Sequence, residues 1–287
     1  MKKISRRSFL AAAGLTVAAL ALTACGGSAS TASSAAASSV AASSEAASTS
    51  AAAAELTTVE AGKLTMATNA TFPPYEMTTD AGTIEGIDVD TAQAIAEKLG
   101  LELQIDDMDF DAALLSVQQG KADIAMAGIT VTDERMAVMS FSDSYATGIQ
   151  SVIVPEGSDI ASVDDLAGKK IGTQRGTTGY LYCSDDFGDD AVVAYDNGLT
   201  AVQALNNGQV DAVVIDNEPA KAYVESNPGL KILDTSYAEE DYAIGMNKSN
   251  TALLEAVNAA LEELKADGTL QALSLIHISE PTRHSLI

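Results

Sequence analysis

Histidine is almost absent from this chain. Its two histidines, His277 and His284, both lie close to the C-terminus. The segment around them, Leu273 to Arg283, reads LSLIHISEPTR and resembles the translation of a transposon adapter used in sequencing libraries. We therefore interpret residues 273–287 as a non-native tail, which leaves the natural part of the chain without histidine. This removes the commonest general base and metal ligand from the candidate chemistry, and we expect neither a metal site nor a cofactor.

Cysteine is equally scarce, and its two positions exclude a disulfide framework. Cys25 ends the tetrapeptide LTAC, which follows four basic residues and the apolar run Phe9 to Leu22. This order indicates a signal peptide over residues 1–24, and the tetrapeptide resembles a bacterial lipobox, which predicts lipidation of Cys25. A transmembrane anchor is the weaker alternative, because a spanning helix needs roughly 20 apolar residues. Cys183 is then left unpaired.

Positive charge is the third thing that the sequence has little of. Sixteen basic residues stand against 40 acidic ones, for a formal net charge of -24. Removal of the signal peptide with its four basic residues takes this charge from -24 to -28. A surface this acidic repels nucleic acid and anionic lipid, so we expect no nucleic-acid partner.

Residues 25–55 also lack the side chains that a fold needs. The segment consists almost wholly of Ser, Ala and Thr, with too little apolar bulk to form a core. We interpret it as a tether between the membrane and the rest of the chain. The pair Arg6 and Arg7 also resembles a twin-arginine export signal, which leaves the export route open.

Between Leu56 and Ala272, short apolar runs alternate with helical patterns, which indicates an α/β fold. The predicted strands are Leu64 to Ala67, Leu101 to Ile105, Ile124 to Ala127, Val152 to Val154, Lys170 to Gly172, Val192 to Tyr195, Ala212 to Ile215 and Tyr242 to Met246. The predicted helices are Asp88 to Leu99, Asp111 to Gln119, Thr132 to Val138, Thr200 to Asn206, Glu218 to Glu225 and Thr251 to Ala266.

One pattern occurs twice in this region. Ser116 to Met126 and Ala204 to Val214 share the same form: a helix end, Gly, two residues, Asp and an apolar strand. Two copies about ninety residues apart predict two similar lobes of ordinary domain size, although chance similarity of common α/β units is the alternative. Ligands of open α/β sheets bind beyond the carboxyl ends of strands, where the first copy has Gly128 and Thr130 and the second has Asp216.

Charged and aromatic residues near these strand ends are the candidates for ligand binding. Arg135 enters a predicted helix, where its planar fork could grip a carboxylate; a solvated first-turn arginine is the alternative. Asp216 suits a cation such as an ammonium group, although it could equally cap the helix that begins after it. Thr178 lies in a small-residue loop whose N–H groups could receive an anion. Phe72 and Phe110 come after strands and could form apolar walls or plain core.

Several motifs in order resemble the family 3 solute-binding proteins of polar amino-acid ABC transporters, over nearly all of Leu64 to Ala272. The matching stretches are ATNATFPPYE from Ala67, GIDVD from Gly86, AGITVTDER from Ala127, FSD from Phe141, GTT from Gly176 and ADGT from Ala266.

This resemblance implies a two-lobed α/β fold of the periplasmic-binding-protein type II class, with a ligand cleft between the lobes. Lobe 1 is expected over 56–146 plus 243–272 and lobe 2 over 147–242. Two hinge strands, near Tyr145 to Gln150 and Ala238 to Tyr242, would join them.

The resemblance also implies roles for the candidate residues. Arg135, Thr130 and the Thr178 backbone would bind an α-carboxylate. The Gly128 carbonyl and Asp216 would bind the α-ammonium group. Phe72 and Phe110 would enclose the side chain, and Asn69 and Gln174 fall where family members vary with substrate.

Several receptors for cationic amino acids carry an acid where this chain has Asn69. The neutral amide therefore favours a polar uncharged ligand side chain, although Glu76 or Asp109 could still supply a charge.

The resemblance further implies a lipid-anchored, extracytoplasmic monomer on the outer face of the cell membrane. It would pass a free polar amino acid to a permease whose ATPase lies on the cytoplasmic side. One alternative is an exported dehydratase-like enzyme on the same scaffold, although no carboxylate pair in the sequence has a spacing that indicates acid–base catalysis. A receptor domain that signals ligand occupancy to a kinase is the other.

Overall fold

The computed structural model describes residues 56–279, and all of them belong to one compact unit, residues 51–287. The predicted signal peptide, the lipidation site at Cys25 and the tether lie outside the described residues. Within 56–279, none of the helices combines the length and the apolar character that crossing a membrane requires.

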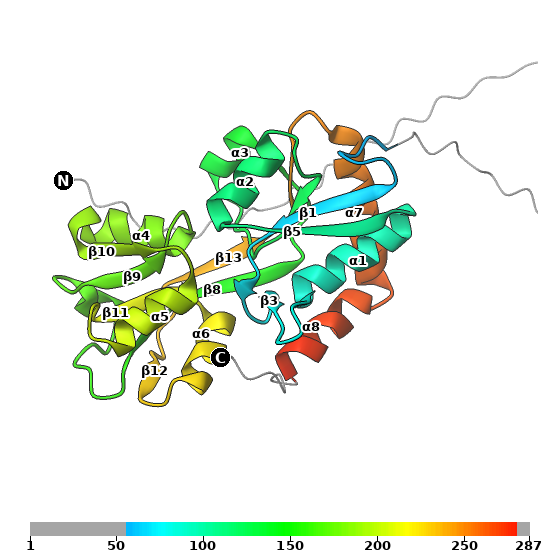
Figure 1. Ribbon diagram of the computed structural model, residues 1–287. Coiled ribbons are helices and arrows are strands. Elements are labelled where there is room, and N and C mark those ends of the chain that lie inside the picture. The colour runs from blue at the N-terminus through cyan, green and yellow to red at the C-terminus, as the bar shows by residue number, and fades with distance from the viewer. Residues whose placement is uncertain (1–55, 280–287) are drawn as a thin grey trace, which may run out of the picture. The chain divides into compact units, whose positions relative to one another are not determined.

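Two separate sheets carry the fold (Figure 1). The first has the order β5-β1-β6-β14-β7, and the second has the order β10-β9-β11-β8-β12, with β13 also paired to β8. The strands of the first sheet are β1 (Lys63–Thr68), β5 (Glu102–Asp107), β6 (Ile124–Ala125), β7 (Ser140–Phe141) and β14 (Gly245–Met246). Those of the second are β8 (Ala146–Pro155), β9 (Ile171–Gln174), β10 (Val192–Tyr195), β11 (Ala212–Asp216), β12 (Leu230–Ile232) and β13 (Ala238–Tyr242).

Each sheet has an apolar core on both faces. Since successive strand residues point to opposite sides of a sheet, neighbouring residues of one strand lie in different cores. In β6, Ile124 packs in the core shared with α1 and α7, whereas Ala125 packs in the core shared with α2. The helices of this lobe are α1 (Ile87–Leu99), α2 (Phe110–Gln118), α3 (Asp133–Val138), α7 (Thr251–Ala266) and α8 (Thr269–Ser279).

The second sheet repeats this arrangement. In β11, Val213 packs with α5 and α6, whereas Val214 packs in the core that contains Cys183 of α4. The helices of this lobe are α4 (Thr178–Phe187), α5 (Gly198–Asn206) and α6 (Asn217–Ser226), with the 3-10 turns η1 (Val163–Leu166) and η2 (Asp189–Ala191). The fold is therefore a two-lobed α/β architecture, as the sequence predicts.

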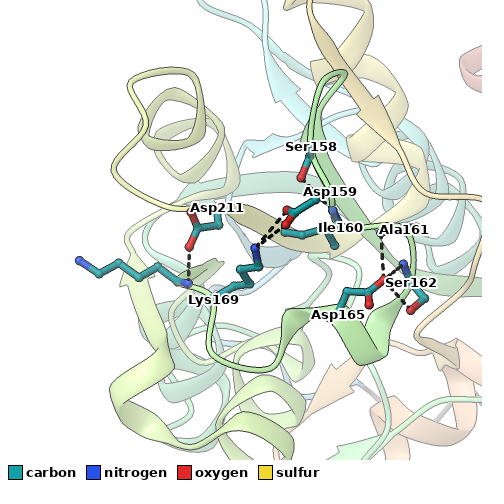
Figure 2. A network of polar contacts seen from close by, with 9 residues as sticks. Ser158, Asp159, Ile160, Ala161, Ser162, Asp165, Lys169 and Asp211 are labelled. Carbon is teal, nitrogen blue, oxygen red and sulfur yellow. Dashed lines mark hydrogen bonds and ion pairs between the residues drawn. The ribbon is translucent and has the colours of Figure 1, made fainter.

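Figure 2 shows polar contacts of the second lobe, one of them just before β9 and others in the turn around η1. Asp211 accepts a hydrogen bond from the backbone N–H of Lys170 (2.7 Å), just before β9. Asp165 accepts from the N–H groups of Ala161 (3.1 Å) and Ser162 (2.9 Å), and these bonds hold the pKa of its carboxyl below the usual value.

β8 and β13 pair in antiparallel fashion, from Ala238 opposite Gln150 to Tyr242 opposite Ala146. The predicted strand Tyr242 to Met246 is wrong, because the chain leaves the second sheet at Tyr242 and re-enters the first at Gly245. A continuous apolar run can therefore conceal a crossing between two sheets. Figure 1 shows β8 and β13 side by side where the chain passes between the lobes.

Sequence patterns also missed the smallest sheet, in which β2 (Thr71–Phe72), β3 (Glu76–Thr78) and β4 (Ile84–Glu85) pair in antiparallel fashion. Strands of two or three residues are too short to show an alternating pattern. The predicted end of lobe 1 at residue 272 falls inside α8, and His277 of the predicted tail lies 2.7 Å from a carboxylate oxygen of Asp90 on α1.

Candidate functional site: a cavity between the two lobes

One cavity of the described region is lined by residues from both sheets. All nine candidate residues of the sequence analysis line it, although their roles toward a ligand stay predictions. The lining consists of Asn69, Phe72, Glu76, Phe110, Ala127, Gly128, Thr130, Arg135, Gln150, Gln174, Thr177, Thr178, Val214, Ile215, Asp216 and Tyr242. The carboxyl ends of β1, β6, β9 and β11 supply much of this set, as expected for open α/β sheets.

Arg135 is a buried cation beside the cavity, with only 8% of its surface exposed. One guanidinium nitrogen donates to the Thr130 carbonyl (2.8 Å) and the other to the Gly176 carbonyl of the second lobe (3.0 Å). Its carbon lies 5.3 Å from the ring centroid of Phe110, within cation–π range. Burial lowers the arginine pKa, and the charges of Glu240 and Asp111 oppose this effect.

Asp216 is a buried anion on the opposite lobe. One carboxylate oxygen accepts from the N–H of Ile149 in β8 (2.7 Å), and the other accepts from the N–H of Glu218 (3.1 Å) and so caps α6. The capping interpretation is therefore correct, and the same side chain also lines the cavity. Burial raises the pKa of Asp216 to about 6, although three hydrogen bonds, including one from Tyr242, act against this shift.

Neither of these two charges forms an ion pair within residues 56–279. A buried charge without an opposite partner is costly. A zwitterion that placed its carboxylate at Arg135 and its ammonium group at Asp216 would supply both missing partners.

Hydrogen bonds across the cavity hold the lobes in contact. The Gln174 amide donates to the Asn69 side-chain oxygen (2.9 Å), and the hydroxyls of Thr130 and Thr178 lie 3.4 Å apart. Because Asn69 also donates to the Met108 carbonyl (2.9 Å), its amide is already positioned by its neighbours. Asn69 and Gln174, the two positions at which family members vary with substrate, are therefore joined to each other by a hydrogen bond across the cavity.

Two aromatic rings, those of Phe72 and Phe110, belong to the cavity lining. Phe72 stacks on Tyr75, with 5.6 Å between centroids, and packs against the apolar cores of both lobes. Phe110 is the first residue of α2 and belongs to the core of lobe 1. Both rings therefore pack against the core and also line the cavity, and their contact with a ligand side chain stays a prediction.

Sequence reasoning missed the contribution of the paired strands β8 and β13. Gln150 of β8 and Tyr242 of β13 line the cavity. Gln150 donates to the buried carboxylate of Glu240 (3.0 Å), which also accepts from the Thr130 hydroxyl (3.1 Å). Only the pairing of the strands brings these groups together, and no local motif marks them. Of the two acids considered as a source of extra charge, Glu76 lines the cavity and Asp109 does not.

Comparison with known proteins identifies the family of this chain. The profile of the family described as bacterial extracellular solute-binding proteins, family 3, matches residues 64–279. This chain belongs to that family.

One relative and two solved structures illustrate the range of the family. The L-cystine-binding protein TcyJ of Escherichia coli K12 is 33% identical over 219 residues, which span 75% of this chain and 82% of TcyJ. A structure of an ancestral arginine-binding protein bound to glutamine is 42% identical, with a TM-score of 0.73, and the match covers 76% of this chain and 99% of that one. A structure of an ancestral arginine-binding protein bound to arginine is also 42% identical, with a TM-score of 0.72 and coverage of 75% and 98%.

Proposed function

We propose that this protein is the substrate-binding component of an amino-acid ABC importer. It captures a free polar L-amino acid outside the cell and delivers it to a membrane permease. The observation that carries the proposal is the pair of buried, unpaired charges, Arg135 and Asp216, at one cavity between two lobes. Relatives whose printed descriptions name cystine, histidine, arginine and glutamine binding support an amino-acid ligand.

In this mechanism the ligand completes the contact between the lobes. Its α-carboxylate binds Arg135, assisted by Thr130 and the backbone at Thr178, and its ammonium group binds Asp216 and the Gly128 carbonyl. Phe72 and Phe110 enclose the side chain beside Asn69 and Gln174. Because each pole of the amino acid contacts groups from both lobes, the ligand adds to the direct contacts between the lobes and stabilises the closed form, which reports occupancy to the permease.

The division of the chain is part of this proposal. We assign 56–146 plus 243–272 to lobe 1 and 147–242 to lobe 2, with hinges in Tyr145 to Gln150 and Ala238 to Tyr242. Residues 1–24 act as signal peptide, Cys25 carries lipid, and 25–55 tether a monomeric receptor to the outer face of the membrane. Loss of membrane association in Cys25→Ala, read by cell fractionation, tests the anchor; retention of the variant would contradict it.

A thermal-shift panel of the common L-amino acids on the purified protein, with calorimetry on each hit, tests the function. A ligand that binds only the native state raises the melting temperature. Stabilisation by one or a few polar amino acids is expected. No shift with any of them, from protein shown to be folded, would contradict the proposal. Turnover of an added amino-acid derivative would favour an enzyme instead.

A further inference from the structure

Two carboxyl groups meet beneath the cavity in a fully buried contact. Glu76 of β3 lines the cavity, Asp88 of α1 does not, and both residues are 0% exposed. One Asp88 oxygen accepts from the N–H of Gly128 (3.0 Å) and from the Tyr145 hydroxyl (2.8 Å). The other Asp88 oxygen and both Glu76 oxygens have no donor among residues 56–279. The N–H of Asp88 donates to the carbonyl of Tyr75 (2.9 Å), the residue before Glu76, so the backbone places the two carboxyl side chains next to each other. The Asp88 charge also acts on Glu76.

With both groups ionised, this contact would set two negative oxygens against each other without a proton between them. Like charges at hydrogen-bond distance and the loss of water both favour protonation. Burial, together with the smaller effect of the Asp88 charge, raises the pKa of Glu76 well above its usual value. Burial also raises the pKa of Asp88 to about 6, against the effect of its two donors.

In the part of the chain that the structure describes, no cation is paired with either carboxyl. The groups that face the pair or its tyrosine neighbours are instead acidic or phenolic. They are Asp107 of β5, Asp216 and Glu218 at the start of α6, Tyr223 of α6, Glu240 of β13, Tyr75, Tyr145 and Tyr242.

We propose that Glu76 and Asp88 share one proton, so that Glu76 faces the cavity as a neutral carboxylic acid, and that this proton discriminates between ligands by side-chain charge. The inference rests on the proposed function, because it assumes that an amino acid occupies the cavity. The negative charge of the pair stays on Asp88, which has two donors and does not line the cavity.

A ligand with an uncharged side chain leaves the shared proton in place, because Arg135 and Asp216 already balance its two α-groups. A cationic side chain adds a positive charge to the same cavity and favours the ionised form of Glu76. The proton then passes from Glu76 to solvent as the cationic ligand binds. Binding of a cationic amino acid is therefore coupled to proton release, and binding of a neutral one is not.

The first test needs no ligand. Infrared spectra of the ligand-free protein at neutral pH should show the C=O stretch of a protonated carboxylic acid, and Glu76→Gln should remove it. Glu262→Gln, a change at an exposed glutamate of α7 outside the cavity, should leave it unchanged. If Glu76→Gln does not fold, Asp88→Asn takes its place as the variant that should lose the band. The asparagine amide can donate to Glu76 in place of the shared proton, while its oxygen still accepts from Gly128 and Tyr145. Absence of the band from the parent would overturn the shared proton.

The second test compares L-arginine with L-glutamine by calorimetry in two buffers of different ionisation enthalpy. About one more proton should be released with arginine than with glutamine. Below the pKa of the pair, arginine affinity should fall by up to about tenfold per pH unit relative to glutamine. In Glu76→Gln both differences should vanish.

Equal proton release with the two ligands would overturn the discrimination. This comparison also cancels the titration of Asp216, which both ligands share. If no amino acid binds at all, the proposed function fails, and the infrared band still decides whether the pair holds a proton.

Discussion

The α/β unit that occurs once in each lobe is built alike in both lobes and ends differently. After α2 and after α5, a glycine with positive φ turns the chain, Gly120 at 67° and Gly208 at 66°, and each donates its N–H to the carbonyl three residues back. Asp123 and Asp211 then tie the next strand to its neighbour. The N–H of Asp123 donates to Thr65 in β1, and the N–H of Asp211 donates to Lys170 just before β9.

Beyond the strands the two copies diverge. β11 ends in Asp216 and passes directly into α6, so this copy presents an anion at the cavity. β6 leads into a loop through Gly128 and Thr130 before α3, so this copy presents backbone groups and then the cation Arg135. One structural unit can thus supply opposite charges to a shared site, because the charge depends on the residues at and beyond the end of the strand.

Removal of Arg135, the cation at the cavity, should have the largest effect, and this effect is on ligand binding. We expect Arg135→Ala to weaken amino-acid binding by at least about thirtyfold, because loss of one partner of a buried charge pair costs about 2–5 kcal/mol. Calorimetry with the best ligand of the panel measures this. Arg175→Ala is the matched control, since Arg175 has a 58% exposed side chain and does not line the cavity. Parent-like affinity in Arg135→Ala would disprove the carboxylate assignment.

The two aspartates should differ in their contribution to stability. Asp123 is 4% exposed and accepts from the N–H groups of Val59 (2.7 Å) and Thr65 (2.8 Å), whereas Asp211 is exposed and accepts from Lys170 alone. We expect Asp123→Ala to lower the free energy of unfolding by about 2–3 kcal/mol, because it strands a buried donor. Asp211→Ala should cost at most about 1 kcal/mol. Urea unfolding measures both, and equal losses would contradict the expected difference.

Protonation of Asp216, the anion at the cavity, should have the smallest effect of the three changes. Burial raises the pKa of Asp216 to about 6. The stability that its neutral form gives the ligand-free protein is therefore present below the ordinary carboxyl pKa and is lost as pH rises through about 6. Ligand affinity should change in the opposite direction, because only the ionised form attracts an ammonium group.

Glutamine is the ligand of choice for this measurement, since its side chain does not titrate. Its affinity should fall about tenfold between neutral pH and one unit below the pKa of Asp216. The pH dependence should flatten in Asp216→Asn. A parent profile that is already flat would show that Asp216 does not bind the ammonium group.

Much of the site could be predicted because its residues stand in short local motifs. Arg135 comes after a strand, a loop and a helix cap that can be read from consecutive residues, and Asp216 ends an apolar strand. Glu240, Gln150 and Tyr242 had no such signal. They approach the cavity only because β8 and β13 pair in one register, which depends on residues about ninety positions apart.

The sequence by itself determined the α/β pattern, the repeated unit and the chemical types at the strand ends, since these depend on local periodicity and on turn residues. Tertiary structure alone decided which carboxyls lost their water, which charges lacked partners and which pair came into contact. Glu76 and Asp88 are twelve residues apart, and no sequence pattern indicates that they lie next to each other. Their protonation depends on a buried contact, because the cost of a charge is set by the dielectric and the donors around it.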